Sequence, residues 1–185
     1  HAVAKAKGVR PDEVTVVVLD RPRHEKLVAE IREAGAKVRF IMDGDVAGAI
    51  AAAQDTNSID MAMGIGGTPE GVITACALKC LGGDIQGMLA PQSEEERERV
   101  LAAGHDLNHV LTIDELVASD NCYFAATGVT NGDMVRGVSY RKNGATTRSL
   151  VMRSKSGTVR FVESQHKLAK LQEYSVVDYS DPTSN

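Results

Sequence analysis

The chain has 185 residues, of which 43% are hydrophobic and 25% charged, and its formal net charge is −4. This length suffices for one sizeable domain with its own core. The net negative charge and the lack of a long Lys/Arg run argue against binding to nucleic acid or to an anionic membrane surface. No stretch is long and apolar enough to span a bilayer, so we expect no membrane partner.

The cysteine pattern points to reduced thiols. The chain contains Cys76, Cys80 and Cys122, an odd number without a paired spacing, which favours a cytoplasmic location. Cys76 and Cys80 are four residues apart in a predicted helix and therefore share a face. A metal-binding pair is conceivable, but we interpret them as two small buried residues.

Two strand–helix units open the chain. Residues 13–20 form a nearly continuous β-branched run, typical of a strand covered on both faces. Residues 25–34 have apolar side chains at helical spacing, and Gly35 is a natural helix stop. Residues 37–42 predict a second strand, and the Ala-rich residues 46–54 predict a short helix.

A third unit is built around a glycine-rich turn. Residues 59–63 predict a buried strand, 64–71 the turn and 72–81 a helix, and 84–89 could form a fourth strand. Repeated strand–helix units predict an α/β fold with a mostly parallel sheet and right-handed crossovers. Ligands of such sheets bind beyond the carboxyl ends of the strands.

The glycine turn combines features suited to both anions and cations. Thr68 is a good N-cap, Pro69 suits the first helical position, and Glu70 then falls in the first turn. Glycines allow the backbone N–H groups to approach an anion, while the Glu70 carboxylate suits a cation. Taken alone, the segment is better interpreted as an ordinary strand-to-helix turn with a capping Thr.

Three turns follow the three strands and should meet at one edge of the sheet. Arg21 and Arg23 flank a proline and could clamp a phosphate, or they could simply be exposed. Asp43 and Asp45 could bind a metal, accept hydrogen bonds from sugar hydroxyls, or act as nucleophile and acid as in haloacid-dehalogenase-like phosphatases. Alternatively, Asp45 could be a helix N-cap. Together with Glu70, these groups indicate phosphoryl chemistry on a polar molecule.

The following segment is polar. Residues 92–103 alternate acidic and basic side chains and predict a solvated helix that starts at the N-cap Ser93. His105 and His109 could suit a metal if they were helical, but the residues between them are typical of a loop.

The rear of the chain predicts an antiparallel extension. Four segments are strand-like: 123–129, 135–140, 146–154 and 158–163. Residues 131–132 and 154–157 are hairpin signals. Residues 165–174 predict a final helix, and residues 180–185 a frayed tail.

Five segments together resemble the class II fructose-1,6-bisphosphatases, in the order found in that family. They are 19–24 (LDRPRH), 43–48 (DGDVAG), 64–72 (GIGGTPEGV), 78–87 (LKCLGGDIQG) and 126–133 (ATGVTNGD). The resemblance implies the lithium-sensitive sugar-phosphatase fold, a layered α/β sandwich. It also implies hydrolysis of the 1-phosphate of fructose 1,6-bisphosphate to fructose 6-phosphate in gluconeogenesis, with Mg²⁺ or Mn²⁺ as cofactor.

The resemblance also implies roles for eight residues. The segment that binds substrate phosphate is matched by Arg21, Pro22 and Arg23, and the segment that holds the sugar by Asp43, Gly44 and Asp45. Gly67 matches a backbone contact to the substrate, and Glu70 matches a metal ligand. These roles argue against a covalent aspartyl-phosphate.

The family's Asp-Pro-Leu/Ile-Asp-Gly-type motif does not occur in these residues. We therefore expect the chain to correspond to the carboxyl-terminal half, with parallel units in 1–104, a strand-rich extension in 105–175 and a tail in 176–185. The amino-terminal half of the same enzyme would supply most of the metal-binding acids and the catalytic residues. We expect the segment alone to bind phosphate weakly without turnover, and the enzyme to be a homo-oligomer.

Two other interpretations remain open. One is a related phosphatase of the same fold, acting on sedoheptulose 1,7-bisphosphate or an inositol phosphate. The other is a regulatory domain that binds an AMP-type nucleotide without a metal, although the glycine turn lacks the Gly-x-Gly-x-x-Gly order of dinucleotide sites.

Overall fold

A parallel sheet of three strands, in the order β2-β1-β3, forms the first layer of the fold. The computed structural model describes residues 1–54 and 58–173. The central strand β1 (Thr15–Leu19) pairs along its whole length with β2 (Lys37–Ile41) and over two residues with β3 (Met61–Ala62). The predicted parallel sheet and the buried central strand are confirmed, and the carboxyl ends of all three strands lie at one edge.

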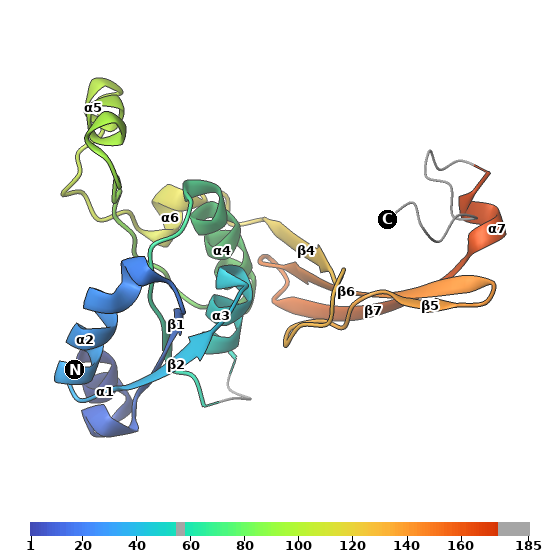
Figure 1. Cartoon of the computed structure of the whole chain (residues 1–185), viewed down its shortest axis with the longest axis horizontal. Helices are drawn as coiled ribbons and strands as arrows, with labels where there is room; N and C mark the ends of the chain where they lie inside the picture. The colour runs from blue at the N-terminus through green and yellow to red at the C-terminus, as the bar shows by residue number, and fades with distance from the viewer. Residues whose placement is uncertain (55–57, 174–185) are drawn as a thin grey trace.

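Helices cover both faces of this sheet (Figure 1). On one face, α1 (Ala2–Lys7) and α2 (Glu25–Glu33) pack against β1 in a core that includes Val16 and Val18. On the other face lie α3 (Asp45–Ala52) and α4 (Thr68–Leu81), which are in contact with each other.

The approach of α3 to the sheet depends on a glycine. A Cβ atom on Gly48 would lie 2.9 Å from Cδ1 of Ile41 and 3.5 Å from Cγ1 of Val17. The distance to Val17 is an ordinary van der Waals contact, but the distance to Ile41 is shorter than real Cβ contacts, so the Ile41 side chain would have to shift. Gly48 therefore lets α3 lie directly on β1 and β2.

The predicted fourth strand at 84–89 is wrong. Among the described residues, this segment forms only an isolated antiparallel bridge, in which Gly87 pairs with Leu111. Its apolar Met88 is 57% exposed, so the segment does not offer a face that an added strand would bury. The chain leaves the sheet here and continues into α5 (Glu94–Ala102).

The polar helix α5 projects from the rest of the molecule (Figure 1). Ser93 caps it as predicted, because its hydroxyl accepts the backbone N–H of Glu96 at 3.2 Å. His109 lies outside a helix, and its Nε2 is 2.6 Å from Oε1 of Glu115 in the short helix α6 (Ile113–Leu116). Hydrogen bonds from the backbone and hydroxyl of Thr112, together with His109, lower the pKa of Glu115 to about 2.

The second sheet is antiparallel and has four strands. These are β4 (Tyr123–Thr127), β5 (Ser139–Arg141), β6 (Gly144–Arg153) and β7 (Thr158–Lys167). The hairpin predicted at 154–157 is confirmed, since β6 and β7 pair from Arg153–Thr158 onward.

Three details of the antiparallel part differ from the prediction. Of the strand expected at 135–140, only residues 139–140 lie in a strand, β5. The signal at 131–132 does not join neighbouring strands, because β4 and β5 lie one after the other along the same side of β6. The predicted helix 165–174 is mostly wrong, because β7 continues to Lys167 by pairing with the start of β6, which leaves only α7 (Leu168–Leu171). The predicted tail at 180–185 lies outside the described residues.

The helices α3 and α4 connect the two sheets, because α3 contacts β1 and β3, α4 contacts β4 and β6, and the two helices pack on each other. Their inner residues form one core cluster with side chains of β4 and β6: Ile50, Ala77, Cys80, Phe124, Leu150 and Met152. The result is the predicted layered α/β sandwich, from which the antiparallel sheet extends as an arm (Figure 1). None of the described helices has the length and hydrophobicity that crossing a membrane requires.

Candidate active site

The glycine-rich turn links β3 to α4 at the edge where the parallel strands end. The helix begins one residue earlier than predicted: Gly67 is the N-cap, Thr68 is the first helical residue, and Pro69 the second. Gly67 takes the extended conformation of a cap, with φ −70° and ψ 152°. Glu70 lies in the first turn as predicted, where the positive end of the helix dipole favours a carboxylate.

A buried histidine joins the first turn to the glycine turn. His24 is 1% exposed, and its Nδ1 lies 2.8 Å from the carbonyl oxygen of Leu19 at the end of β1. Its Nε2 accepts the backbone N–H of Ile65 at 2.8 Å. These partners fit a neutral ring with the proton on Nδ1. Gly64 gives the ring room, since a Cβ there would lie 3.2 Å from Cε1 of His24.

The two arginines of the first turn differ in their contacts. Arg23 reaches the glycine turn, where its Nε donates to the carbonyl oxygen of Ile65 at 2.8 Å. Arg21 stays within its own turn, because its Nη1 donates to the carbonyl oxygen of Asp20 at 2.7 Å. Pro22 lies between them and opens the 3₁₀ turn η2 (Pro22–His24), which contains Arg23. Both guanidinium groups thus lie at the same sheet edge, but only Arg23 bonds to the glycine turn.

The second turn brings a carboxylate to the same place. Gly44 is the N-cap of α3 with φ 86°, a conformation that glycine adopts without strain, so the alternative of Asp45 as N-cap is wrong. Asp43 accepts the N–H of Gly44 at 2.8 Å. Asp45 begins α3, and its Oδ2 lies 3.0 Å from the position of a Cβ on Gly66.

The carboxylate of Glu70 folds back onto Gly67, where a Cβ atom would overlap its oxygen. Asp45 and Glu70, from different helices, therefore lie against two adjacent glycines. Carboxylate oxygens are the donors that hard divalent cations such as Mg²⁺ and Mn²⁺ prefer. These residues fit one side of such a cation site, while the nearby helix N-terminus offers N–H groups to an anion.

The three predicted turns thus meet at one edge of the sheet. Arg23, Asp45 and Glu70 lie against the glycine turn, whereas Arg21 and Asp43 lie at the same edge and bond within their own turns. The sequence analysis missed His24 as the residue that holds the turns together. Its position in a polar turn gives no sign of burial, and its partner Ile65 is 41 residues away.

A model of the bacterial, glpX-encoded fructose-1,6-bisphosphatases matches residues 1–166. The chain belongs to the class II fructose-1,6-bisphosphatase family. It is 40% identical over 182 residues to the class 2 fructose-1,6-bisphosphatase of Haemophilus influenzae, covering 91% of this chain and 55% of that protein.

Two cyanobacterial relatives carry a double name, D-fructose 1,6-bisphosphatase class 2/sedoheptulose 1,7-bisphosphatase. The protein of Synechococcus sp. is 42% identical over 177 residues, covering 89% of this chain and 51% of the relative. That of Trichodesmium erythraeum is 44% identical over 168 residues, covering 84% and 49%. This member of the class II fructose-1,6-bisphosphatase family thus spans about half the length of the curated relatives it matches.

The first prediction concerns His24. We expect His24→Ala to lower the free energy of unfolding by about 2–4 kcal/mol, because it opens a cavity and leaves the Leu19 carbonyl and the Ile65 N–H without partners. Urea unfolding followed by circular dichroism measures the change. His105→Ala, at an exposed histidine, is the control and should stay within about 0.5 kcal/mol of the wild type. Equal stabilities of the two variants would contradict the role given to His24.

Proposed function

We propose that this chain forms part of an enzyme that hydrolyses the 1-phosphate of fructose 1,6-bisphosphate, giving fructose 6-phosphate and inorganic phosphate. The observation that carries the proposal is the meeting of Arg23, Asp45 and Glu70 at the glycine turn. Family membership adds the reaction, because the relatives are named for it. The enzyme would act in the cytoplasm, in gluconeogenesis.

The metal role is assigned to Glu70, with Mg²⁺ or Mn²⁺ as the cation. When bound, such a cation lowers the pKa of a coordinated water and offsets charge on the leaving oxygen. Glu70 would hold one side of the cation, and the backbone N–H groups at the start of α4, which Gly67 caps, would be donors for the substrate. Asp43, Gly44 and Asp45 hold the sugar by accepting hydrogen bonds from its hydroxyls.

Substrate phosphate is assigned to the segment Arg21, Pro22 and Arg23. A guanidinium group binds phosphate with two parallel charge-assisted hydrogen bonds. Arg23 is suited to this because its Nε already bonds to Ile65, which leaves its terminal NH₂ groups as further donors. Binding energy from this group fixes the position of the reacting phosphorus.

The other partner is the remaining half of the same enzyme. Relatives are about twice as long as this chain, and the proposal assigns most metal-binding acids and the catalytic residues to the other half. The antiparallel arm offers apolar area for that half or for a second copy in a homo-oligomer, with Tyr140 64% and Phe161 71% exposed.

A second substrate is favoured by the double name of two relatives. Sedoheptulose 1,7-bisphosphate carries the same two phosphates on a ketose one carbon longer. The same arginines and carboxylates would bind it. Rates on the two sugars, measured with one enzyme preparation, decide between them.

The proposed function is tested by combining this chain with the part of a relative that it does not span. We expect the 185-residue chain alone to bind fructose 1,6-bisphosphate weakly and release no phosphate. Co-expressed with the part of the Haemophilus influenzae relative that it does not span, it should release phosphate in the presence of Mn²⁺ and stop when the metal is chelated. Turnover by the chain alone near the rate of the full-length relative would contradict the division of labour, and an inactive but stable complex would contradict the function.

The metal role of Glu70 is tested in that complex. Glu70→Gln keeps the shape of the side chain but removes its charge, so we expect the kcat to fall roughly 100-fold with little loss of stability. Phosphate release at saturating Mn²⁺ measures the change. Glu95→Gln makes the same substitution in the first turn of the exposed helix α5 and should leave the rate unchanged.

A pair of glycine variants tests independently whether the Glu70 carboxylate binds the metal. Gly67→Ala displaces the Glu70 carboxylate, whereas Gly71→Ala adds a methyl group that meets nothing within 4 Å. Only Gly67→Ala should raise the Mn²⁺ concentration needed for half-maximal rate. If Glu70→Gln and Gly67→Ala both behave as wild type, Glu70 is not a metal ligand.

Phosphate binding by Arg23 predicts a different kinetic effect. Arg23→Ala removes a charge-assisted clamp made equally in the ground and transition states, so the KM should rise about 10- to 100-fold with little change in kcat. Arg99→Ala on the exposed helix α5 is the control. A KM left at the wild-type value would mean that Arg23 does not contact the substrate.

A further inference from the structure

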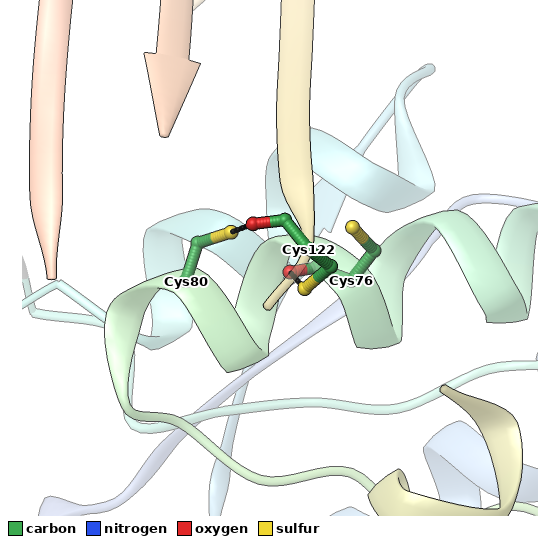
Figure 2. Close-up of side chains that lie close together, drawn as sticks. All are labelled: Cys76, Cys80 and Cys122. Carbon is green, nitrogen blue, oxygen red and sulfur yellow. Dashed lines mark hydrogen bonds between the residues drawn. The ribbon is translucent and has the colours of Figure 1, made fainter. Parts of the chain in front are cut away.

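Three cysteines that are far apart in the sequence lie together at the junction of the two sheets. Cys76 and Cys80 come from successive turns of α4, and Cys122 comes from the residue before β4 (Figure 2). Their sulfur atoms all lie within 4.8 Å of one another. All three are free thiols. The cluster contains every cysteine of the chain.

Each thiol contacts the backbone of the element opposite to its own. The Sγ of Cys76 lies 3.3 Å from the carbonyl oxygen of Tyr123, and that of Cys80 lies 3.7 Å from the carbonyl oxygen of Cys122. In return, the Sγ of Cys122 lies 3.8 Å from the carbonyl oxygen of Cys76. The sulfur atoms are therefore held in the seam between α4 and β4.

Ser154 fixes the position of Cys122 from the far side. Its hydroxyl oxygen accepts the backbone N–H of Cys122 at 2.8 Å and lies 3.4 Å from the Sγ of the same residue. The hydroxyl also donates to the carbonyl oxygen of Asp120 at 2.8 Å. A ligand held in this way by its neighbours keeps its orientation without a bound ion.

The spacing of the sulfur atoms matches that of ligands around one ion. Three points no more than 4.8 Å apart lie within about 2.8 Å of a common centre, and a zinc–sulfur bond is about 2.3 Å long. Each sulfur would need to move by about 0.5 Å, which a change of side-chain torsion supplies.

The electrostatics separate one thiol from the other two. Burial raises the pKa of Cys76 to about 11 and that of Cys80 to about 12. Burial also tends to raise the pKa of Cys122. Its hydrogen bonds with Ser154 and the other two cysteines, and the positive charge of Lys79, act in the opposite direction and leave the pKa of Cys122 lowered. A cation at the centre would supply the positive charge that the two buried thiols need to ionise.

We propose that Cys76, Cys80 and Cys122 form a trithiolate site for a thiophilic d¹⁰ cation, zinc. Each thiol loses its proton to solvent as its sulfur bonds to the ion. Soft sulfur donors select Zn²⁺ over the hard cations Mg²⁺ and Mn²⁺, which prefer oxygen. The fourth coordination position is left for a water molecule, since the described cluster offers three sulfur ligands.

The zinc site is separate from the candidate active site and does not rest on the proposed function. Cys76 lies six residues after Glu70 on the same helix, which is about 9 Å along the axis. Bound zinc would link α4 to Cys122, the residue that leads into β4, and so reinforce the contact that α4 already makes with the antiparallel sheet. Since the ion binds only the folded arrangement, it should stabilise the protein.

The test uses the reduced 185-residue chain, first shown to carry three free thiols. Zn²⁺ is titrated in competition with a chromophoric zinc indicator, and Co²⁺ is used as a spectroscopic probe. We expect one equivalent of Zn²⁺ to bind, a thiolate-to-cobalt charge-transfer band that Zn²⁺ abolishes, and a higher Tm with zinc. No charge-transfer band, or no bound zinc, overturns the proposal.

Cys122→Ser removes one ligand with little change in volume and should weaken zinc binding at least 100-fold and abolish the rise in Tm. His105→Asn removes an exposed potential zinc ligand elsewhere and should change neither. Zinc binding that survives Cys122→Ser, or that is lost in His105→Asn, overturns the proposal. If Cys122→Ser does not fold, Cys76→Ser, at the other half-buried cysteine, is judged by the same criteria.

Discussion

The hydrogen bonds of one buried imidazole fix the geometry on which the candidate site depends. His24 links the carbonyl at the end of β1 to an N–H of the glycine turn, and burial makes either bond costly to lose. The preceding residue, Arg23, is thereby held beside the carbonyl of Ile65. A buried polar contact between distant residues therefore fixes how a cationic side chain and an anion-binding turn are arranged at the surface.

The helices α3 and α4 connect the candidate site to the rest of the molecule. The helix α3 contacts β1 and β3 of the parallel sheet, α4 contacts β4 and β6 of the antiparallel sheet, and the two helices pack on each other in one core cluster. Their N-termini, at Gly44 and Gly67, lie at the edge where the strands end, which places Asp45 and Glu70 against neighbouring glycines. Rigid placement of the two carboxylates follows from the sandwich rather than from the turns alone.

The sequence predicted those features that depend on nearby residues. β-branched runs, helical spacing and turn residues are local, so the parallel units, the polar helix after Ser93 and the hairpin at 154–157 could be recognised. The errors come from long-range pairing: residues 165–167 become strand because the start of β6 is next to them. For the same reason, neither the burial of His24 nor the approach of Cys122 to the helix could be predicted, since their partners lie 41 and 46 residues away.

The helix α4 thereby presents two kinds of donor to two kinds of cation. Oxygen donors lie at its amino-terminal turn, where the helix dipole and open glycines suit an exposed, exchangeable ion and a phosphate. Sulfur donors lie further along, where Cys80 is 2% exposed and Cys76 and Cys122 are half-buried. Because the hard cations of phosphoryl chemistry bind thiolates poorly, an excess of Mg²⁺ would not fill the sulfur cluster. Zinc bound to the three cysteines would stabilise α4, the helix that carries Glu70, and this zinc would not compete with Mg²⁺ or Mn²⁺ for the carboxylates.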